Sequence, residues 1–529
     1  MNKRVLLAGG LLLFAAVWAA VPAVAQKRGG VVNWFVYADP SRLDLFTETP
    51  LAVQQVTAGV YSGLLQFDPR DPGKIVPDLA TSYEASNGGK TYTFTLRQGV
   101  KWHDGKPFTS ADVKATFDRI LAPNFRAPRC GSVVRPVIDS VETMGPHQVR
   151  FNLKFGAATF VPAMASAWCR IAAKHILERD GNLMEPKSQI GTGPFKFKRY
   201  ERGTIIEWER NPDYYNPQLP YVEGVRQFVL QGATRQLAAA KAGRLHIWDT
   251  WPPMKKSAAQ ELRGARGDEV EVYTHPLNTL WAVHFNTQKP PFHHKDLRQA
   301  VNLALDRHEL FEKAFEGIGV PCAILDPKLY GDWALPLAEL NRMPGCRKDK
   351  SEDIAKAKAL VEKHYPGGLD LEVVTRTVGN YVDRAQLVAS QLRKISIRPT
   401  IKTYESAAGY SAFGQGDFNL IVAQDTAMFL PDPAGTFGIL FTSVAGRNWG
   451  KHSDPYIDEM AEKGLREQDP AKRRQIYHDL QRYILTEGGS AVVVGWVEGW
   501  YFRDKRLRGY VPAPTVYDNN TFQTVWLEQ

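Results

Sequence analysis

The stretch from residue 87 to residue 120 constrains the fold more than any other part of the sequence. After a turn at Asn87-Gly88-Gly89, apolar residues alternate with polar ones in the period-two pattern of a half-buried strand: Tyr92, Phe94 and Leu96. Thr109 or Ser110 then caps a helix whose apolar residues recur at helical spacing: Val113, Phe117 and Ile120. The stretch predicts a strand, a turn and a capped helix, and it places no residue for catalysis.

The first 25 residues have the pattern of an export signal. Two basic residues precede an apolar run over residues 5–21, and Ala23-Val24-Ala25 is the small-x-small pattern that a signal peptidase cleaves. We therefore expect a periplasmic protein. The first cysteine is Cys130, far from the cleavage point, so we expect no lipid anchor.

Length and composition favour a large globular protein. A chain of 529 residues suggests about three domains at ~150 residues each. Hydrophobic residues make up 44% and charged residues 23%, which excludes a disordered chain. The formal net charge of +10 is not concentrated in any Lys/Arg-rich tract, so we expect a solvated surface, a slight preference for acidic ligands and no nucleic-acid partner.

Strands and amphipathic helices alternate along the rest of the chain, which indicates an α/β protein. A helix is expected to end near residues 61–63, and another to span about 234–242. Apolar stripes over 297–305 and 382–392 predict core-facing helices, and Ser351, Ser453 and Asp469-Pro470 mark further helix starts. Strands are expected at residues 31–37, 148–153, 205–208, 369–375, 418–423 and 490–496.

Known catalytic motifs are absent from the sequence. It contains neither Gly-x-Ser-x-Gly nor His-Glu-x-x-His, and Gly191-Thr192-Gly193 runs into a proline that removes an amide a phosphate would need. His103 lies in a turn with no partner at ligand spacing, and the pair His293-His294 lies in a Pro-rich loop. We therefore expect no enzyme, no metal site and no cofactor.

The 87–120 stretch closely resembles the signature segment of the bacterial extracellular solute-binding proteins of family 5, the dipeptide-, oligopeptide-, opine- and nickel-binding receptors of ABC importers. The order and spacing of several further strings strengthen the resemblance. They are Ile-Val-Pro-Asp-Leu-Ala at 75–80, Gly-Thr-Gly-Pro-Phe at 191–195, Asn-Pro-Asp-Tyr-Tyr at 211–215, Phe-Asn-Thr at 285–287 and Asp-Leu-Arg-Gln-Ala-Val at 296–301.

The resemblance implies a two-lobed periplasmic-binding-protein fold of type II with an extra subdomain and a hinge made by two chain crossings. The implied division is a signal peptide (1–25), a first lobe (26–70, 190–278 and 500–529), an inserted subdomain (71–189) and a second lobe (279–499). The chain has four cysteines, and an exported protein favours disulfides, for which three pairings are possible. We favour Cys130–Cys169 and Cys322–Cys346, because each pair then lies within one lobe.

Aromatic residues at strand ends and loops are candidates to line the cleft between the lobes. Together with Thr49 they give these candidate ligand contacts: Tyr37, Trp281, Trp449, Trp496 and Trp500. Arg376 follows a predicted strand and is a candidate carboxylate clamp, because guanidinium binds carboxylate in a bidentate manner.

The segment 424–433 bears on the choice of ligand. In peptide-binding members of the family, an aspartate three residues before the acidic-Pro pair holds the ligand's amino group, and that position is Phe429 here. Either Asp425 replaces the missing carboxylate from four residues away, or the ligand has no free N-terminal ammonium. Both alternatives stay open.

The resulting hypothesis is a monomeric periplasmic binding component of an ABC importer. It captures a peptide-like solute by lobe closure and delivers it to permease subunits in the inner membrane. Opines or other non-peptide solutes are the alternative within the family, with a nickel chelate less favoured. A secreted hydrolase is the alternative from a different class.

Overall fold

The computed structural model describes residues 27–40, 42–48, 51–427, 430, 432–445, 447–487, 489, 491–512 and 521–528. No helix within these ranges is both long enough and apolar enough to span a membrane. We call residues up to 269, together with the tail after Asp504, the N-terminal half, and residues 270–504 the C-terminal half.

A four-stranded sheet begins the N-terminal half. In spatial order its strands are β1 (Val31–Val36), β10 (Gly224–Val229), β9 (Ile205–Arg210) and β8 (Phe195–Glu201), with β1 parallel to β10. The first helix, α1 (Leu51–Thr57), ends earlier than the sequence led us to expect. The carbonyl groups of Gly59 and Val60 accept hydrogen bonds from the amides of Phe195 (3.1 Å) and Gly193 (2.9 Å) instead of continuing the helix.

The 87–120 stretch folds as predicted, within a second four-stranded sheet. Its strands are β4 (Ala80–Ser86), β5 (Thr91–Leu96), β7 (Gln148–Leu153) and β6 (Ile138–Thr143). Thr109 and Asp112 form a capping box at the start of α2 (Ser110–Leu121), whose predicted apolar face is fully buried. The remaining elements here are β2 (Leu65–Asp68), β3 (Asp71–Pro77), α3 (Cys130–Val134), α4 (Phe160–Ala165) and α5 (Lys174–Asp180).

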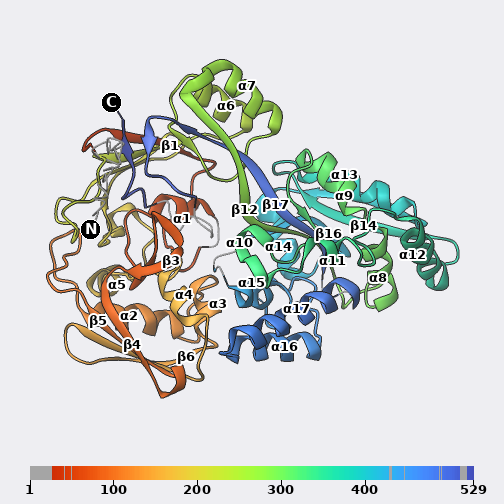
Figure 1. Cartoon of the computed structure of the whole chain (residues 1–529), viewed down its shortest axis with the longest axis horizontal. Helices are drawn as coiled ribbons and strands as arrows, with labels where there is room; N and C mark the ends of the chain where they lie inside the picture. Colours follow the sequence, from red (N-terminus) through yellow and green to blue (C-terminus); the bar gives the residue numbers. More distant parts are fainter. Residues whose placement is uncertain are drawn as a thin grey trace, which may run out of the picture.

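Two long strands join the halves in one large sheet. β12 (Val270–Phe285) and β17 (Ala491–Asp504) pair antiparallel along most of their length. They pass from beneath α6 (Ala233–Lys241) and α7 (Lys256–Arg266) into the C-terminal half (Figure 1). The sheet also contains β11 (Ile247–Trp248), β13 (Val320–Pro321), β14 (Leu369–Arg376), β15 (Ile397–Tyr404) and β16 (Leu420–Ala427).

Two of these strands differ from their predicted bounds. β17 extends past the expected end at residue 496 because it keeps pairing with β12 as far as Asp504. β16 begins and ends later than expected because its partners on β12 run from Thr279 to Phe285. In both strands the pairing register, and not the local pattern, decides where the strand ends.

Helices cover the C-terminal half of this sheet: α8 (Lys295–Ala304), α9 (Arg307–Phe315), α12 (Ser351–His364), α13 (Tyr381–Arg393) and α14 (Ser406–Gln415). Beside them lie α15 (Pro433–Leu440), α16 (Pro455–Arg466) and α17 (Pro470–Glu487). The two predicted stripes contribute Leu297, Val301 and Val388 to the core. Asp454 caps α16, in place of the expected Ser453, because its carboxylate accepts the amide of Tyr456 at 3.0 Å.

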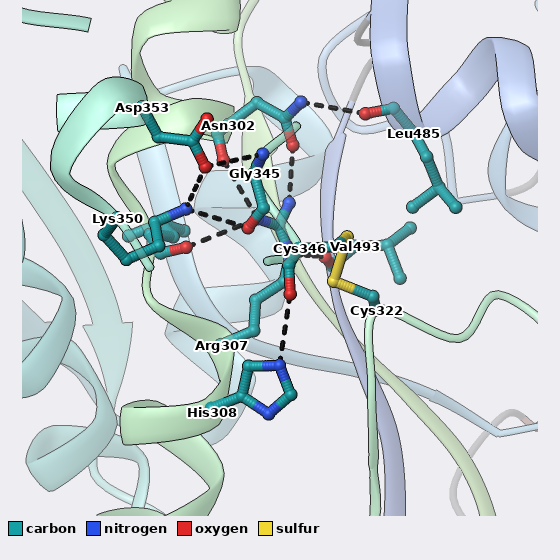
Figure 2. Close-up of a disulfide and its surroundings, with 11 residues drawn as sticks. Asn302, Arg307, His308, Cys322, Gly345, Cys346, Lys350, Asp353, Leu485 and Val493 are labelled. Atoms are coloured by element: carbon teal, nitrogen blue, oxygen red, sulfur yellow. Dashed lines mark hydrogen bonds and ion pairs between the residues drawn. A yellow bond between two sulfur atoms is a disulfide. The ribbon is translucent and has the colours of Figure 1, made fainter. Parts of the chain in front are cut away.

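Both disulfides form with the predicted pairing, Cys130–Cys169 and Cys322–Cys346. Figure 2 shows the second one beside the buried guanidinium of Arg307. After β17 the chain returns to the N-terminal half, where the Phe522 ring meets Trp34 edge-on with 5.0 Å between ring centroids. The exact division into lobes stays a prediction.

Candidate functional site

Tyr37 and Arg376 come from different halves, and the charge of Arg376 acts on Tyr37. Tyr37 follows β1 and is half-buried, and Arg376 ends β14 with 5% of its surface exposed. Burial is the main cause that raises the pKa of Tyr37 to about 12, and the charges acting on it include Arg129 and Arg376. The sequence predicted both residues as ligand contacts, and the structure places them within range of each other's charge.

Aromatic rings hold the guanidinium of Arg376. Its central carbon lies 4.1 Å from the ring centroid of Tyr410 and 5.1 Å from that of Tyr381. A Cβ on Gly409 would approach the Arg376 Cγ to 2.6 Å, so only glycine lets α14 pack this close. A guanidinium stacked on rings directs its N–H groups in its own plane, which is the geometry that matches a carboxylate.

Arg129 approaches the same place from the N-terminal half. It directly precedes α3, is 4% exposed, and its guanidinium carbon lies 4.6 Å from the ring centroid of Trp168. Across the junction between the halves, α3 faces α15 of the C-terminal half (Figure 1). Burial first, and then the charge of Arg447, lower the pKa of Arg129 to about 9.

Arg447 contributes a further cation from the C-terminal half. It lies in the loop before α16, is half-buried, and acts electrostatically on both Arg129 and His284. His284 is 1% exposed, and neither of its ring nitrogens has a hydrogen-bond partner within the part of the chain that the structure describes. Burial, followed by the charge of Arg447, lowers the pKa of His284 to about 3. The imidazole is therefore neutral, and the charge here comes from arginine.

Trp449 supplies an aromatic surface beside these cations. Its ring centroid lies 6.3 Å from that of Tyr410 and 6.2 Å from that of Phe413. The Trp449 ring is half-buried, and its Nε1 has no hydrogen-bond acceptor among the described residues. This predicted contact therefore adjoins the group formed by Arg376 and Tyr410.

The other three predicted tryptophans lie in hydrophobic clusters. Trp281 is fully buried in the core of the C-terminal half. The guanidinium carbon of Arg384 lies 5.1 Å from its ring centroid and 4.7 Å from that of Tyr381, which connects Trp281 to the group around Arg376. Trp496 is fully buried in another cluster, where it meets Tyr330 edge-on at 5.7 Å, and Trp500 packs beneath α6 and α7 in a third. That these three rings contact the ligand stays a prediction.

The side chains of three predicted ligand contacts lie outside the described part of the structure. Thr49 and Phe429 lie outside the described residues. The backbone of Asp425 belongs to β16 and pairs with Trp281 on β12, but its side chain also lies outside the description. Whether Asp425 replaces the amino-group anchor stays an open prediction.

Further contacts join the halves beside this group. Gln468 donates a hydrogen bond to the carbonyl of Gly156 at 3.0 Å, and the Arg466 guanidinium carbon lies 4.0 Å from the ring centroid of Phe155. The ring of Trp251 lies 6.5 Å from that of Tyr381 at the start of α13. The group around Arg376 therefore lies at a junction that side chains from both halves close.

Sequence reasoning missed Arg129, Trp168, Tyr410 and Arg447. The first two had a usable signal, since each directly precedes a cysteine of the same disulfide. Tyr410 and Arg447 had none, because only the packing of α14 and the loop before α16 brings them near Arg376.

The chemistry of the group suits recognition of an anion. Within the described residues no cluster of three or more His, Cys, Asp or Glu side chains could hold a metal ion. Buried arginines stacked on aromatic rings are suited to bind carboxylate by bidentate hydrogen bonds and to contact apolar parts of a solute.

Comparisons with known proteins identify the family of the chain. The family model described as bacterial extracellular solute-binding proteins, family 5 (middle) matches residues 74–448. The chain is 27% identical to a probable di/tripeptide-binding protein 5 of Pseudomonas aeruginosa, over 90% of this chain and 92% of that one.

Two solved structures share the fold. The binding protein AgaA of A. tumefaciens R10, in complex with agropinic acid, is 25% identical with a TM-score of 0.80 over 94% of this chain and 99% of that one. The DppA protein of Helicobacter pylori, in complex with the peptide STSA, is 24% identical with a TM-score of 0.82 over 95% and 99%. The chain belongs to the family 5 bacterial extracellular solute-binding proteins.

Proposed function

We propose that this protein is the periplasmic substrate-binding component of an ABC importer and that it captures a peptide-like solute between its halves. The observation that carries the proposal is the convergence of Tyr37 and Arg129 with Arg376 and Tyr410, which come from opposite halves. A solute held by groups from both halves stabilises the closed arrangement over the open one. The di/tripeptide-binding relative supports a peptide-like ligand.

The strand pair β12–β17 is the element about which the halves move. Among the described strands, these two carry the large sheet from α6 and α7 into the C-terminal half, and their register shifts between Pro276 and Thr279. A bulge of this kind interrupts the regular ladder and is a natural place for a sheet to bend. Closure about this pair presents a single surface to the permease subunits in the inner membrane.

An opine-type solute is the second candidate. Phe429 occupies the position where peptide-binding relatives have an aspartate for the ligand's amino group, and AgaA, of the same fold, binds agropinic acid. An ammonium buried without a carboxylate loses several kcal/mol of hydration. A ligand whose nitrogen is substituted avoids that loss.

Calorimetric titration of matched free and N-acetylated dipeptides tests whether the ligand is peptide-like or opine-type. If Asp425 holds the amino group of a peptide ligand, free dipeptides should bind the wild type tightly and lose affinity in Asp425→Asn. The opine-type candidate predicts that acetylated or opine-type ligands bind better, and that Phe429→Asp restores binding of free dipeptides. Nanomolar binding of free dipeptides that survives both substitutions would refute the placement of the amino group.

The proposal treats the protein as a binder and not an enzyme. Native mass spectrometry of protein purified from its own periplasm should show one bound solute per chain. Incubation with a peptide library should leave every peptide intact, and cleavage with multiple turnover would favour the secreted hydrolase instead.

A further inference from the structure

His275 lies on β12 directly before the point at which the long strand pair is interrupted. It pairs with Gly499 on β17, Pro276 follows it, and the register then shifts between Pro276 and Thr279. Proline has no amide hydrogen to donate to a ladder, which is a physical reason for the interruption at this residue. The side chain of His275 is therefore placed at the bend about which the halves are proposed to move.

Both ring nitrogens of His275 face oxygen acceptors. Nε2 lies 2.8 Å from Oδ1 of Asp249, and Nδ1 lies 2.6 Å from the carbonyl oxygen of Pro276. A carbonyl oxygen and an ionised carboxylate only accept hydrogen bonds, and a neutral imidazole has a single N–H group. Two such contacts therefore require one further proton, which the imidazole and the carboxylate share. We call the contact between His275 and Asp249 the hinge ion pair.

Asp249 comes from the N-terminal half. It directly follows β11, is 8% exposed, and its Oδ2 has no hydrogen-bond partner among the described residues. In the part of the chain that the structure describes, its one ion pair is with His275. A buried carboxylate that loses its cation keeps an uncompensated charge, which is strongly unfavourable. The proton of the hinge ion pair therefore decides whether β12 and the segment after β11 attract each other.

Aromatic rings favour the charged form of the imidazole. The ring of His275 stacks on that of Tyr501 on β17, with 4.1 Å between ring centroids, and lies 6.0 Å from that of Tyr273 on its own strand. Aromatic faces attract a cation. Burial lowers the pKa of His275, but the charge of Asp249 and the hydrogen bonds to Asp249 and Pro276 outweigh it, so the pKa is raised above 6.5.

Other charged groups near the hinge come from β17 and from α10 (Pro327–Tyr330). Glu498 lies opposite Pro276, is 5% exposed, and also raises the pKa of His275 by its charge. Lys328 of α10 forms an ion pair with Glu498 at 2.6 Å. Burial raises the pKa of Asp326, which caps α10, to about 6. Because Asp326 titrates in the same range, the hinge ion pair has to be tested by substitution.

The hinge ion pair is formed in an arrangement in which side chains of both halves meet at the junction. We propose that this pair stabilises the closed arrangement only while it holds its proton, so that the protein binds its solute more tightly at mildly acidic than at mildly alkaline pH. Proton and solute then each raise the affinity of the protein for the other. The contribution is fully present below pH 6.5 and is lost as the pH rises through the raised pKa of His275. This inference rests on the proposed function and adds a pH dependence to it.

The test uses a solute whose own charge stays constant. N-acetyl-Ala-Glu has no ammonium group, and both its carboxylates are ionised above about pH 6. We would titrate the protein with it calorimetrically at about pH 6 and about pH 8, at one ionic strength. The wild type should bind at least about threefold more tightly at the lower pH. Titrations at about pH 7 in buffers of different ionisation enthalpy should show that binding takes up protons.

Two substitutions assign the effect to the hinge ion pair. His275→Gln and Asp249→Asn each remove one member and keep a polar side chain of similar size. In each variant the affinity for N-acetyl-Ala-Glu should be the same at both pH values, and binding should take up no protons. Circular dichroism of each variant confirms that it is folded.

His364→Gln is the matched control. Nε2 of His364 lies 2.8 Å from Oδ2 of Asp296, and the His364 side chain is 20% exposed, against 19% for His275. The control pair joins α12 to α8 within the C-terminal half, away from β12 and β17. This variant should keep the pH dependence of the wild type.

The possible results separate the two proposals. If the wild type binds equally at both pH values, or if the pH dependence persists in either hinge variant, the role of the hinge ion pair is overturned while the binding function stands. Loss of the pH dependence in His364→Gln would overturn it as well. If N-acetyl-Ala-Glu does not bind, the same titrations use the solute that native mass spectrometry identifies. If no solute binds at any pH, the proposed function fails, and the inference fails with it.

Discussion

Two buried arginines, each beside a disulfide, serve different purposes in this protein. Arg307 lies next to Cys322–Cys346 and donates to the carbonyls of Val493 (2.7 Å), Asn302 (2.9 Å) and Gly345 (2.6 Å), as Figure 2 shows. Arg129 lies next to Cys130–Cys169 at the junction between the halves. Burial and the charge of Arg447 lower the pKa of Arg129, and the nearby Tyr410 and Tyr37 oppose that shift.

The difference shows how to tell a structural cation from one suited to a ligand. Burial lowers the pKa of Arg307 to about 10, although the carboxylates of Asp353 and Asp306 oppose that shift. Its N–H groups join helix α9 to β17 and to the loop that the disulfide closes. Arg129 instead stacks on the ring of Trp168, and the charge of Arg447 from the opposite half acts against its own. Burial and a disulfide alone do not distinguish the two.

The largest expected effect is on stability, from Arg307→Met. The substitution leaves at least three buried carbonyls without their donor, and each lost hydrogen bond to a charged group is worth about 1.5–3 kcal/mol. We expect the free energy of unfolding to fall by more than about 3 kcal/mol in urea titrations followed by tryptophan fluorescence. A loss below about 1 kcal/mol would contradict the structural role of Arg307.

Removing each disulfide sharpens the comparison. The pairs are separated by 39 and 24 residues, and the chain-entropy model gives about 3–4 kcal/mol for loops of this size. We expect the double substitutions Cys130→Ala/Cys169→Ala and Cys322→Ala/Cys346→Ala to destabilise the protein by similar amounts. Only the first should also weaken binding of N-acetyl-Ala-Glu in calorimetry. A loss of affinity in both variants would show that the effect follows general stability.

A smaller effect is expected from Trp168→Leu. Removing the indole takes away the ring on which Arg129 stacks, and cation–π contacts are worth about 0.5–2 kcal/mol. Binding of N-acetyl-Ala-Glu should weaken by about 2- to 30-fold, as measured by calorimetry on folded protein. Trp333→Leu is the control, because Arg473 lies 5.3 Å from the Trp333 ring and both residues belong to the C-terminal half. An equal effect of both substitutions would contradict a specific role for Trp168.

The smallest expected effect on stability at pH 7 comes from His284, a buried residue on which the charge of Arg447 acts. Burial and Arg447 lower its pKa from 6.5 to about 3, so the folded protein holds it neutral while the unfolded chain binds a proton. Its contribution to stability is therefore present above pH 6.5 and is lost as the pH falls towards 3.

His284→Leu removes this proton linkage and two buried nitrogens that have no hydrogen-bond partner among the described residues. We expect stability at pH 7 to rise by up to about 1 kcal/mol. The variant should also lose less stability than the wild type between pH 6.5 and 4, as measured by thermal unfolding at several pH values. Identical pH profiles for the two proteins would show that His284 does not titrate as described.

The sequence by itself determined the local elements and the family. Period-two alternation over Thr91–Leu96 and the spacing of Val113, Phe117 and Ile120 are set by neighbours in the chain, so they predicted β5 and α2 correctly. Helix caps and glycine turns are local in the same sense. The resemblance to family 5 receptors likewise rests on short strings that keep their order.

Only the tertiary structure decided which side chains meet. The sequence predicts Trp281, Trp449 and Trp496 alike as aromatic residues at strand ends or loops. In the structure Trp281 and Trp496 are fully buried, while Trp449 adjoins Tyr410. Strand register selects the face of a sheet that a residue occupies, and a shift of one position reverses it. Arg129 and Arg447 are far apart in the chain, yet the charge of Arg447 acts on Arg129, and α3 packs against α15 of the C-terminal half. Local sequence cannot encode that proximity, since it depends on how distant segments pack together.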